Sequence, residues 1–142
     1  MIFKKPSKQR LRAWYDFRQQ LETSCNPLDD VATLYSHAPA VKIYSDPYDQ
    51  TTWPTPWELL EENEYCPFNQ ILAVAYSLKL TNRFKDWQPK ITITIDNNNK
   101  CVYYLLYHLD KVYGFEKDKW IPIKNLPRSL TVKKIYYLDS LH

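Results

Sequence analysis

The order of helix and strand signals along the chain predicts an α+β fold. In residues 1–80 apolar side chains recur every three or four positions after helix-start signals, whereas residues 90–138 alternate apolar and polar side chains. Helices that all precede the strands are typical of a sheet packed against a separate helical layer. The 142 residues are 44% apolar, which is enough to bury one core. We therefore predict a single α+β domain over 1–142, with N-terminal helices followed by an antiparallel β-meander that packs on a central helix at about 67–80.

Two helices are predicted in the first part of the chain. Ser7 can cap the first helix, because its hydroxyl can accept a hydrogen bond from a first-turn amide. The second helix has Asn26 as its N-cap and Pro27 as its first residue, and it is expected to end near His37. The face of the first helix that we expect to pack carries Leu11, Trp14, Tyr15, Arg18 and Leu21.

A turn-rich stretch separates these helices from a third helix. Residues 41–44 predict a short strand, and residues 46–49 predict a turn. The third helix has a complete start signal, since Thr55 can cap it, Pro56 fits its first position and Glu58 can reach back to the cap amide. This combination predicts a capping box.

The fourth helix is the predicted centre of the core. Cys66 is expected at its N-cap and Pro67 at its first position. Its apolar stripe is wide enough to contact neighbours on several sides. The stripe consists of Phe68, Ile71, Leu72, Val74, Ala75, Tyr76, Leu78 and Leu80.

The sheet is predicted from Lys90 onward as an antiparallel meander joined by tight turns. The segment 96–99 supplies Asp and Asn residues that tolerate positive φ, so it can join the first two strands. Pro122 has no amide hydrogen, which places its strand at an edge of the sheet or its amide position toward solvent. The expected strands cover residues 91–95, 101–108, 112–115, 120–123 and 130–138.

Composition excludes several classes of function. No apolar run approaches the roughly 18 to 20 residues of a membrane span, and no signal-peptide pattern follows Met1, so we expect no membrane association and no secretion. The only glycine, Gly114, excludes glycine-rich phosphate-binding loops. The three cysteines and three histidines lack the spacing of metal ligands. We therefore predict no metal and no cofactor.

Charge is distributed unevenly, although the formal net charge is only +3. Residues 46–64 are acidic, and residues 1–18 and 117–134 are basic. Three interpretations are open: solvated faces of a monomer, a docking surface for a protein partner, or nucleic-acid contact, which would combine basic residues with exposed aromatic ones. In the docking interpretation residues 1–10 begin a basic arm, and the binding residues are Lys4, Lys5, Lys8, Arg10 and Arg12.

Aromatic residues are abundant, with 5 Trp and 12 Tyr. Many must fill the core, but those beside prolines and turns are expected to be more exposed and to mark an interface. Carbohydrate stacking is a further interpretation of such rings. The candidates are Tyr44, Tyr48, Trp53, Trp57, Tyr65 and Trp87, of which we favour Tyr48, Trp53 and Trp57 as partner-binding residues.

An alternative function is catalytic. A thiol at a helix N-terminus, as predicted for Cys66, lies where the helix dipole favours a thiolate. His108 at a strand end could be its base, and Asp110 or Asp118 could orient the imidazole. A cap role for Cys66 and a strand-end role for His108 explain the same residues without catalysis, and we favour no catalytic residue.

These residues are similar to a known pattern. A cysteine at a helix start, a later histidine and the segment 120–123 resemble the transglutaminase-like and papain-like superfamily, which implies a cysteine-dependent hydrolase or acyltransferase that uses Cys66, His108 and Asp110. The sequence departs from that family at Lys124 and Asn125, where an aspartate would be expected.

A second resemblance points to a virus. The W-P-T-P-W-E-L-L sequence of residues 53–60, with Tyr65 and Cys66 shortly after it, resembles small uncharacterised proteins of large tailed bacteriophages. The similarity covers about residues 52–96 and transfers no catalytic residue. It implies a non-enzymatic virion or assembly component of the neck, tail or baseplate, located in the virion or the host cytoplasm. The expected partners are other protein subunits of the phage particle.

Overall fold

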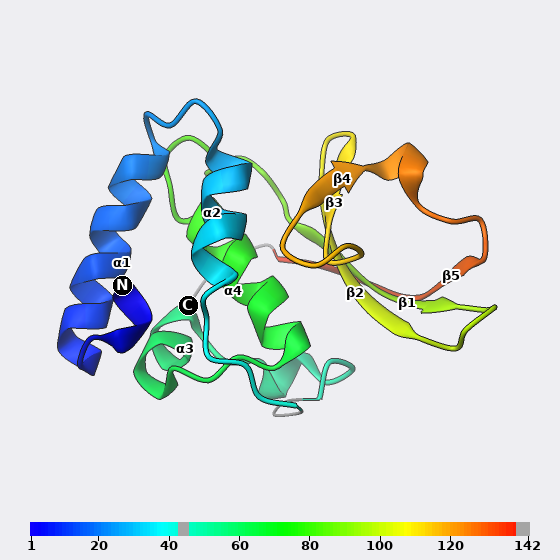
Figure 1. The fold of residues 1–142 in the computed structure, drawn as a ribbon, viewed down its shortest axis with the longest axis horizontal. Helices are drawn as coiled ribbons and strands as arrows, with labels where there is room; N and C mark the ends of the chain where they lie inside the picture. The colour runs from blue at the N-terminus through cyan, green and yellow to red at the C-terminus, as the bar shows by residue number, and fades with distance from the viewer. Residues whose placement is uncertain (43–45, 139–142) are drawn as a thin grey trace.

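The computed structural model describes residues 1–42 and 46–138. The helices lie on one side of the molecule and the sheet on the other (Figure 1). The helical part comprises η1 (Ile2–Lys4), α1 (Ser7–Leu21), α2 (Pro27–Tyr35), η2 (Gln50–Thr52), α3 (Pro56–Glu62) and α4 (Pro67–Lys79). The sheet part comprises β1 (Lys90–Asp96), β2 (Val102–His108), β3 (Lys111–Tyr113), β4 (Trp120–Pro122), η3 (Ile123–Asn125) and β5 (Leu130–Tyr137). This order confirms the predicted α+β fold.

Helix α4 is the centre of the helical layer, as its apolar stripe predicts, and it contacts α1, α2, α3 and β2. A buried polar cluster fixes these contacts. The Trp14 indole Nε1 donates to Ser77 Oγ at 2.8 Å, and Tyr35 Oη lies 3.1 Å from the same oxygen. Because a buried polar atom is costly without a partner, this cluster sets how α1 and α2 pack on α4.

The starts of α3 and α4 confirm their predictions. Thr55 Oγ1 accepts a hydrogen bond from the Glu58 amide at 3.2 Å, and Glu58 Oε1 accepts one from the Thr55 amide at 3.0 Å. At the next helix Cys66 is the N-cap, and its Sγ accepts from the Asn69 amide at 3.4 Å. Local sequence therefore determines where both helices begin.

The starts of α1 and α2 correct the sequence-based prediction. Ser7 is the first helical residue and Pro6 occupies the N-cap position, so Ser7 does not cap the helix. Asn26 does precede α2 at the N-cap, but its side chain makes no cap hydrogen bond, and its own amide donates to Ser24 Oγ at 3.1 Å. The helix ends at Tyr35, slightly before its expected end.

The N-terminal segment, where a basic arm was predicted at 1–10, is packed against the core through two of its residues. Ile2 and Phe3 are buried. The Phe3 ring lies 5.6 Å from the rings of both Tyr35 and Tyr65. Apolar burial of these two residues holds the segment on the body of the protein.

The sheet is antiparallel with the order β4-β3-β2-β1-β5. Strands β1 to β4 form the predicted meander, whereas β5 pairs with β1, so the connection that contains η3 runs from one edge of the sheet to the other. Pro122 lies in the edge strand β4, as predicted. The positive φ of the β1–β2 turn is at Lys100 (φ 62), just after the predicted segment 96–99.

The two faces of the sheet contribute to different apolar clusters. Ile91 and Leu106 pair across β1 and β2 and join the main core with the helices. On the other face a smaller cluster contains Leu105, Val112 and Ile121. Alternation along each strand therefore gives the sheet two buried sides.

Gly114 allows the β3–β4 hairpin to approach β2. Its φ is +114, and a Cβ at this position would lie 2.1 Å from the carbonyl oxygen of Tyr104. Only glycine avoids that overlap with backbone.

Two expectations concern regions near the gaps. The strand predicted at 41–44 includes residues 43 and 44, which lie outside the described residues, as does the candidate interface residue Tyr44. Just before it, Ala40 forms a parallel bridge with Tyr65. Across 1–42 and 46–138, no helix has the length and apolar character that a membrane span requires.

Candidate functional site

The structure does not bring Cys66 and His108 together. Cys66 is 3% exposed and lies beside Tyr104 of β2, whose ring is 5.3 Å from that of Phe68. Burial raises the pKa of Tyr104, and the nearby Cys66 raises it further. His108 is four residues further along β2, or roughly 13 Å at about 3.3 Å per residue. The geometry therefore provides no thiol–imidazole pair at Cys66.

His108 lies in a different environment. Its ring is 5.3 Å from the rings of both Phe84 and Trp87, and it lines a cavity together with Cys25 instead of Cys66. Burial lowers the pKa of His108, and the Asp110 carboxylate opposes that shift. The predicted His108–Asp110 proximity is therefore present, but the nucleophile of the predicted catalytic set is elsewhere.

No metal site was predicted from the sequence. Among the described residues, Cys25, Cys66 and Cys101 form no disulfide bond. Over the described residues, no group of three or more His, Cys, Asp or Glu side chains could hold a metal ion.

Two of the aromatic candidates are packed inside the fold. The Trp53 ring lies 4.9 Å from that of Phe68 and 4.8 Å from that of Tyr136, and its Nε1 donates to the Pro47 carbonyl at 3.2 Å. Trp53 thus joins the helical layer to β5 and is partly buried there, and its role as a partner-binding residue stays a prediction. Tyr65 is only 1% exposed and is also a core residue.

Tyr48 and Trp57 are exposed, as predicted, but they belong to different surfaces. Tyr48 is 56% exposed, and its carbonyl accepts a hydrogen bond from Tyr136 Oη of β5 at 3.1 Å. Trp57 is 45% exposed and lies at the α1–α3 contact, 5.7 Å from the Trp14 ring. Tyr48 therefore lies beside β5 and Trp57 beside α1.

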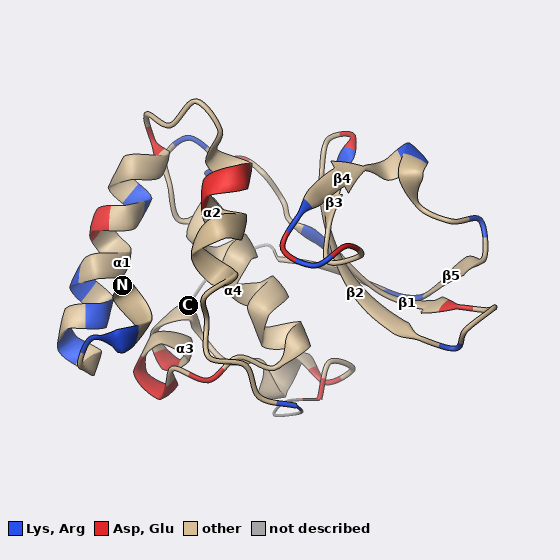
Figure 2. Cartoon of the chain, in the orientation of Figure 1, with Lys and Arg blue, Asp and Glu red and all other residues tan. Residues whose placement is uncertain are grey.

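The predicted basic residues also divide into two kinds. Lys4, Lys5, Lys8 and Arg12 are exposed along η1 and α1, opposite in charge to the acidic residues of α3 (Figure 2). Arg10 is only partly exposed and also has a role in the fold, and its role as a partner-binding residue stays a prediction.

The Arg10 side chain is held by backbone carbonyls. Its Nε donates to Leu60 O at 2.6 Å and its Nη2 to Glu61 O at 2.8 Å, both at the C-terminal end of α3. Its Nη1 donates to Lys5 O at 2.5 Å. A cation is stabilised at a helix C-terminus, so Arg10 ties α1 and the N-terminal segment to α3.

One continuous stack of rings and guanidinium groups lies on the surface of α1 and α3. Trp57 contacts Trp14, the Arg18 guanidinium lies 4.3 Å from the Trp14 ring and 5.5 Å from the Tyr15 ring, and Arg12 lies 5.8 Å from Tyr15. We call these five residues the aromatic–arginine ladder. Its outer rings remain exposed, 45% for Trp57 and 47% for Tyr15.

Arg18 of the ladder is held by a contact with the end of α4, whereas Arg12 is mostly exposed. Arg18 Nη1 donates to Leu80 O at 3.3 Å at the end of α4, and burial lowers the pKa of Arg18. Arg12 forms an ion pair with Asp16 at 3.4 Å, with both side chains mostly exposed. Such a surface pair contributes at most about 1 kcal/mol. Arg12 can therefore change partners at little cost.

The composition of the ladder is typical of a binding surface. Trp, Tyr and Arg are enriched among the side chains that dominate the energy of protein interfaces. Trp and Tyr bury large areas with few rotatable bonds, and Arg offers directed hydrogen-bond donors. The ladder presents all three types on elements that are already fixed.

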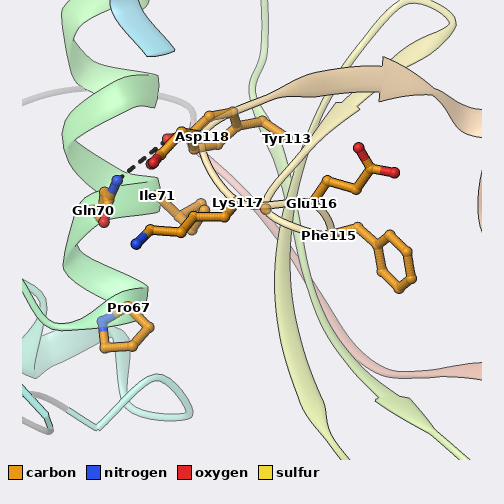
Figure 3. A pocket seen from close by; sticks show the side chains of 9 residues that line it. Pro67, Gln70, Ile71, Tyr113, Phe115, Glu116, Lys117 and Asp118 are labelled. Atoms are coloured by element: carbon orange, nitrogen blue, oxygen red, sulfur yellow. Dashed lines mark hydrogen bonds between the residues drawn. The ribbon is translucent and has the colours of Figure 1, made fainter. Parts of the chain in front are cut away.

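A separate hollow of about 270 Å³ lies between α4 and the β3–β4 hairpin. Figure 3 shows Gln70 bonded to Tyr113, whose Oη accepts from Gln70 Nε2 at 3.3 Å, and Lys117 reaching toward α4. Phe115 and Glu116 point away from the helix in the same view. The hydrogen bond between Gln70 and Tyr113 joins α4 to β3 at this hollow.

Sequence reasoning did not predict that Tyr15 and Arg18 belong to the ladder. Both were expected on the packing face of the first helix, whereas Tyr15 and the neighbouring Leu11 are exposed. The signal was present as Trp14, Tyr15 and Arg18 at spacings of one, three and four, which places a guanidinium over two rings. The position of α3 beside these rings was not deducible from that spacing.

Comparison with known proteins returned neither a matching protein-family model nor a matching curated protein.

Proposed function

We propose that this chain is a non-enzymatic docking protein, a virion or assembly component of a tailed phage, that binds a neighbouring subunit through the aromatic–arginine ladder. The observation that carries the proposal is the exposure of Trp57 and Tyr15 on a stack whose centre is anchored to α4. Preformed anchors lose little conformational entropy when a partner covers them.

Charge beside the ladder indicates the partner's character. Lys4, Lys5 and Lys8 are exposed on the same α1 side of the molecule, in addition to Arg12. Complementary acidic groups on a partner would steer association and fix orientation.

The α3 side of the ladder is acidic, because Glu58, Glu61 and Glu62 are exposed on the same helix as Trp57. The partner surface therefore carries acidic groups opposite α1, basic groups opposite α3 and apolar pockets for the two outer rings.

The hydrolase alternative lacks a supporting observation, because Cys66 and His108 occupy separate environments. Single-stranded nucleic acid remains a competing ligand for stacked rings and arginines, and the test below distinguishes it.

The test is co-sedimentation of the tagged chain with particles or assembly intermediates of the phage that encodes it. We expect the wild-type chain to co-sediment and the Trp57→Ala and Tyr15→Ala variants to lose at least tenfold in occupancy. Tyr137→Ala is the matched control, because Tyr137 is 48% exposed but lies on β5 away from α1 and α3.

Three outcomes would contradict the proposal. The first is a wild-type chain absent from every particle fraction, and the second is equal loss in the Tyr137→Ala control. The third is co-sedimentation that disappears after nuclease treatment and weakens steeply with salt, which is the behaviour of phosphate-driven binding.

A further inference from the structure

A cavity of about 450 Å³ lies where three segments distant in sequence meet, away from the ladder. The start of α2 forms one wall, the α4–β1 connection a second, and the β2–β3 turn a third. Its volume is within the range of roughly 300 to 1,000 Å³ that is typical of small-molecule sites.

The second wall is aromatic and rigidly held. The rings of Phe84 and Trp87 lie 5.9 Å apart, and both lie 5.3 Å from His108. The Trp87 amide donates to the Phe84 carbonyl at 3.0 Å, and Lys79 Nζ donates to the Trp87 carbonyl at 2.5 Å. Phe84 is buried, while Trp87 and His108 are half-buried, so the latter two present ring surface to the cavity.

Cationic groups stand at the rim on opposite walls. Arg83 is oriented by its own contacts, because its Nη1 donates to Ser24 O at 2.6 Å and its amide donates to Glu22 Oε1 at 2.9 Å. Lys111 is exposed at the start of β3. Among the described lining residues the carboxylate is that of Asp29, and the Glu22 carboxylate nearby already accepts hydrogen bonds from the Asn82 and Arg83 amides. Arg83 and Lys111 are the side chains of the lining that can hold an anionic group of a ligand.

We propose that this cavity binds a small planar aromatic molecule that carries one anionic group, with its ring against Trp87 and His108 and its anion between Arg83 and Lys111. Flat aromatic surface beside fixed cations suits this chemistry, since the ring gains stacking contact and the anion gains charge-assisted hydrogen bonds. An aromatic carboxylate and a nucleoside monophosphate share these features.

Cys25 supplies a built-in reporter. It lines the cavity and is exposed, and Cys101, in the β1–β2 connection, is exposed as well and serves as an internal control. A bound ligand blocks alkylation of Cys25 by iodoacetamide and leaves Cys101 reactive. Peptide mass spectrometry gives both rates from one sample.

The experiment titrates the full chain with two probes, adenosine 5′-monophosphate and 4-hydroxybenzoate, each beside its neutral analogue, adenosine and 4-hydroxybenzamide. We expect at least one anionic probe at millimolar concentration to slow Cys25 alkylation tenfold or more, with at least a fivefold weaker effect of its neutral analogue. Protection by the monophosphate alone identifies a phosphate-bearing ligand, and protection by the benzoate alone identifies a carboxylate.

Two variants of exposed lysines test the proposal without a buried substitution that could disturb folding. Lys111→Glu changes an exposed side chain and should weaken protection at least tenfold, while Lys124→Glu, the same charge change on η3, should not. Failure of both probes to protect Cys25 in the folded chain would overturn the proposal. Equal protection by neutral and anionic probes would overturn it too, as would equal effects of the two lysine variants.

Discussion

The α1–α3 surface and strand β5 carry apolar side chains that are exposed to a similar degree, but the residues around these side chains differ. Tyr15 and Trp57 belong to a stack that arginines hold in place. On β5, Val132, Ile135 and Tyr137 are about equally exposed, yet this strand carries the devices that discourage pairing at a sheet edge. Exposure alone therefore does not identify a docking surface, and the arrangement around the exposed ring has to be considered.

The devices on β5 are a bulge and two lysines. The register with β1 shifts between Ile93 and Thr94, which leaves Lys133 as the extra residue, and Lys134 follows it. Bulges and edge lysines are common means of preventing edge-to-edge association. The ladder carries no β edge and needs no such protection, so its exposure is available for a partner.

The largest expected change in the free energy of unfolding comes from removing the central ring of the ladder. Trp14→Ala removes a side chain that is 1% exposed, together with its bond to Ser77, and should lower the free energy of unfolding by about 3–5 kcal/mol. Urea denaturation followed by circular dichroism measures this. A loss below about 1 kcal/mol would show that the ladder does not rest on the core.

The next effect concerns the attachment of α1 to α3. Arg10→Ala removes charge-assisted bonds to the Leu60 and Glu61 carbonyls and should cost about 1.5–3 kcal/mol. Lys8→Ala, an exposed change on the same helix, is the control and should stay within about 0.5 kcal/mol. Equal effects of the two variants would contradict the assigned role of Arg10.

The edge devices of β5 can be removed directly. The double variant Lys133→Val and Lys134→Val should convert a protected edge into an associating one and should raise the sedimentation coefficient as protein concentration increases. Lys4→Val with Lys5→Val removes the same charge from η1 and the residue after it and is the control. Unchanged sedimentation of the β5 variant would show that the bulge alone suffices.

A smaller loss of stability is expected on acidification, and it arises from His108 at the end of β2. Because burial lowers the pKa of His108 below its ordinary value near 6.5, the unfolded chain binds the proton more readily. Stability should therefore be full above about pH 6.5 and fall as the pH drops through the lower pKa of the folded state. His108→Gln should flatten this dependence in thermal unfolding between pH 7 and pH 5.

Asp110 gives a check on the sign of that effect. Its carboxylate raises the pKa of His108, so Asp110→Asn should lower that pKa further and steepen the loss of stability in acid. A shallower dependence in Asp110→Asn would contradict the assigned electrostatics.

The smallest changes in the free energy of unfolding are expected from a matched pair of tyrosine variants, one in the ladder and one on β5. Tyr15→Ala and Tyr137→Ala each truncate a half-exposed tyrosine and should change the free energy of unfolding by about 0.5 kcal/mol or less. Their effects on partner binding should nevertheless differ at least tenfold. A large stability loss in Tyr15→Ala would mean that the ladder is a packing device and not a binding surface.

Much of the fold was predictable because its signals are local. The capping box of Thr55 and Glu58, the apolar stripe of α4 and the period-two alternation of β1 each involve residues within a few positions of one another. Ser7 was misplaced as a cap because Pro6 also fits that position and a hydroxyl does not by itself decide the helix boundary.

The candidate site was predictable only in part. Trp57 is exposed as expected, but Trp53, four residues earlier in the same motif, is covered by Phe68 and Tyr136. The partner ring from β5 is more than eighty positions away in the chain. A neighbouring proline in the sequence indicates a turn, but it does not show which distant residues will pack against the side chains of that turn.

The sequence by itself determined which segments become helices and strands, their order, and the uneven placement of charge, because these depend on short-range spacing and on composition. Tertiary structure alone decided that β5 returns to β1, that Arg10 is held by α3, that Cys66 faces Tyr104 and not His108, and that Trp57 completes a stack with α1. These features depend on contacts between residues tens of positions apart. Such contacts are selected by the packing of the whole core, which no local pattern specifies.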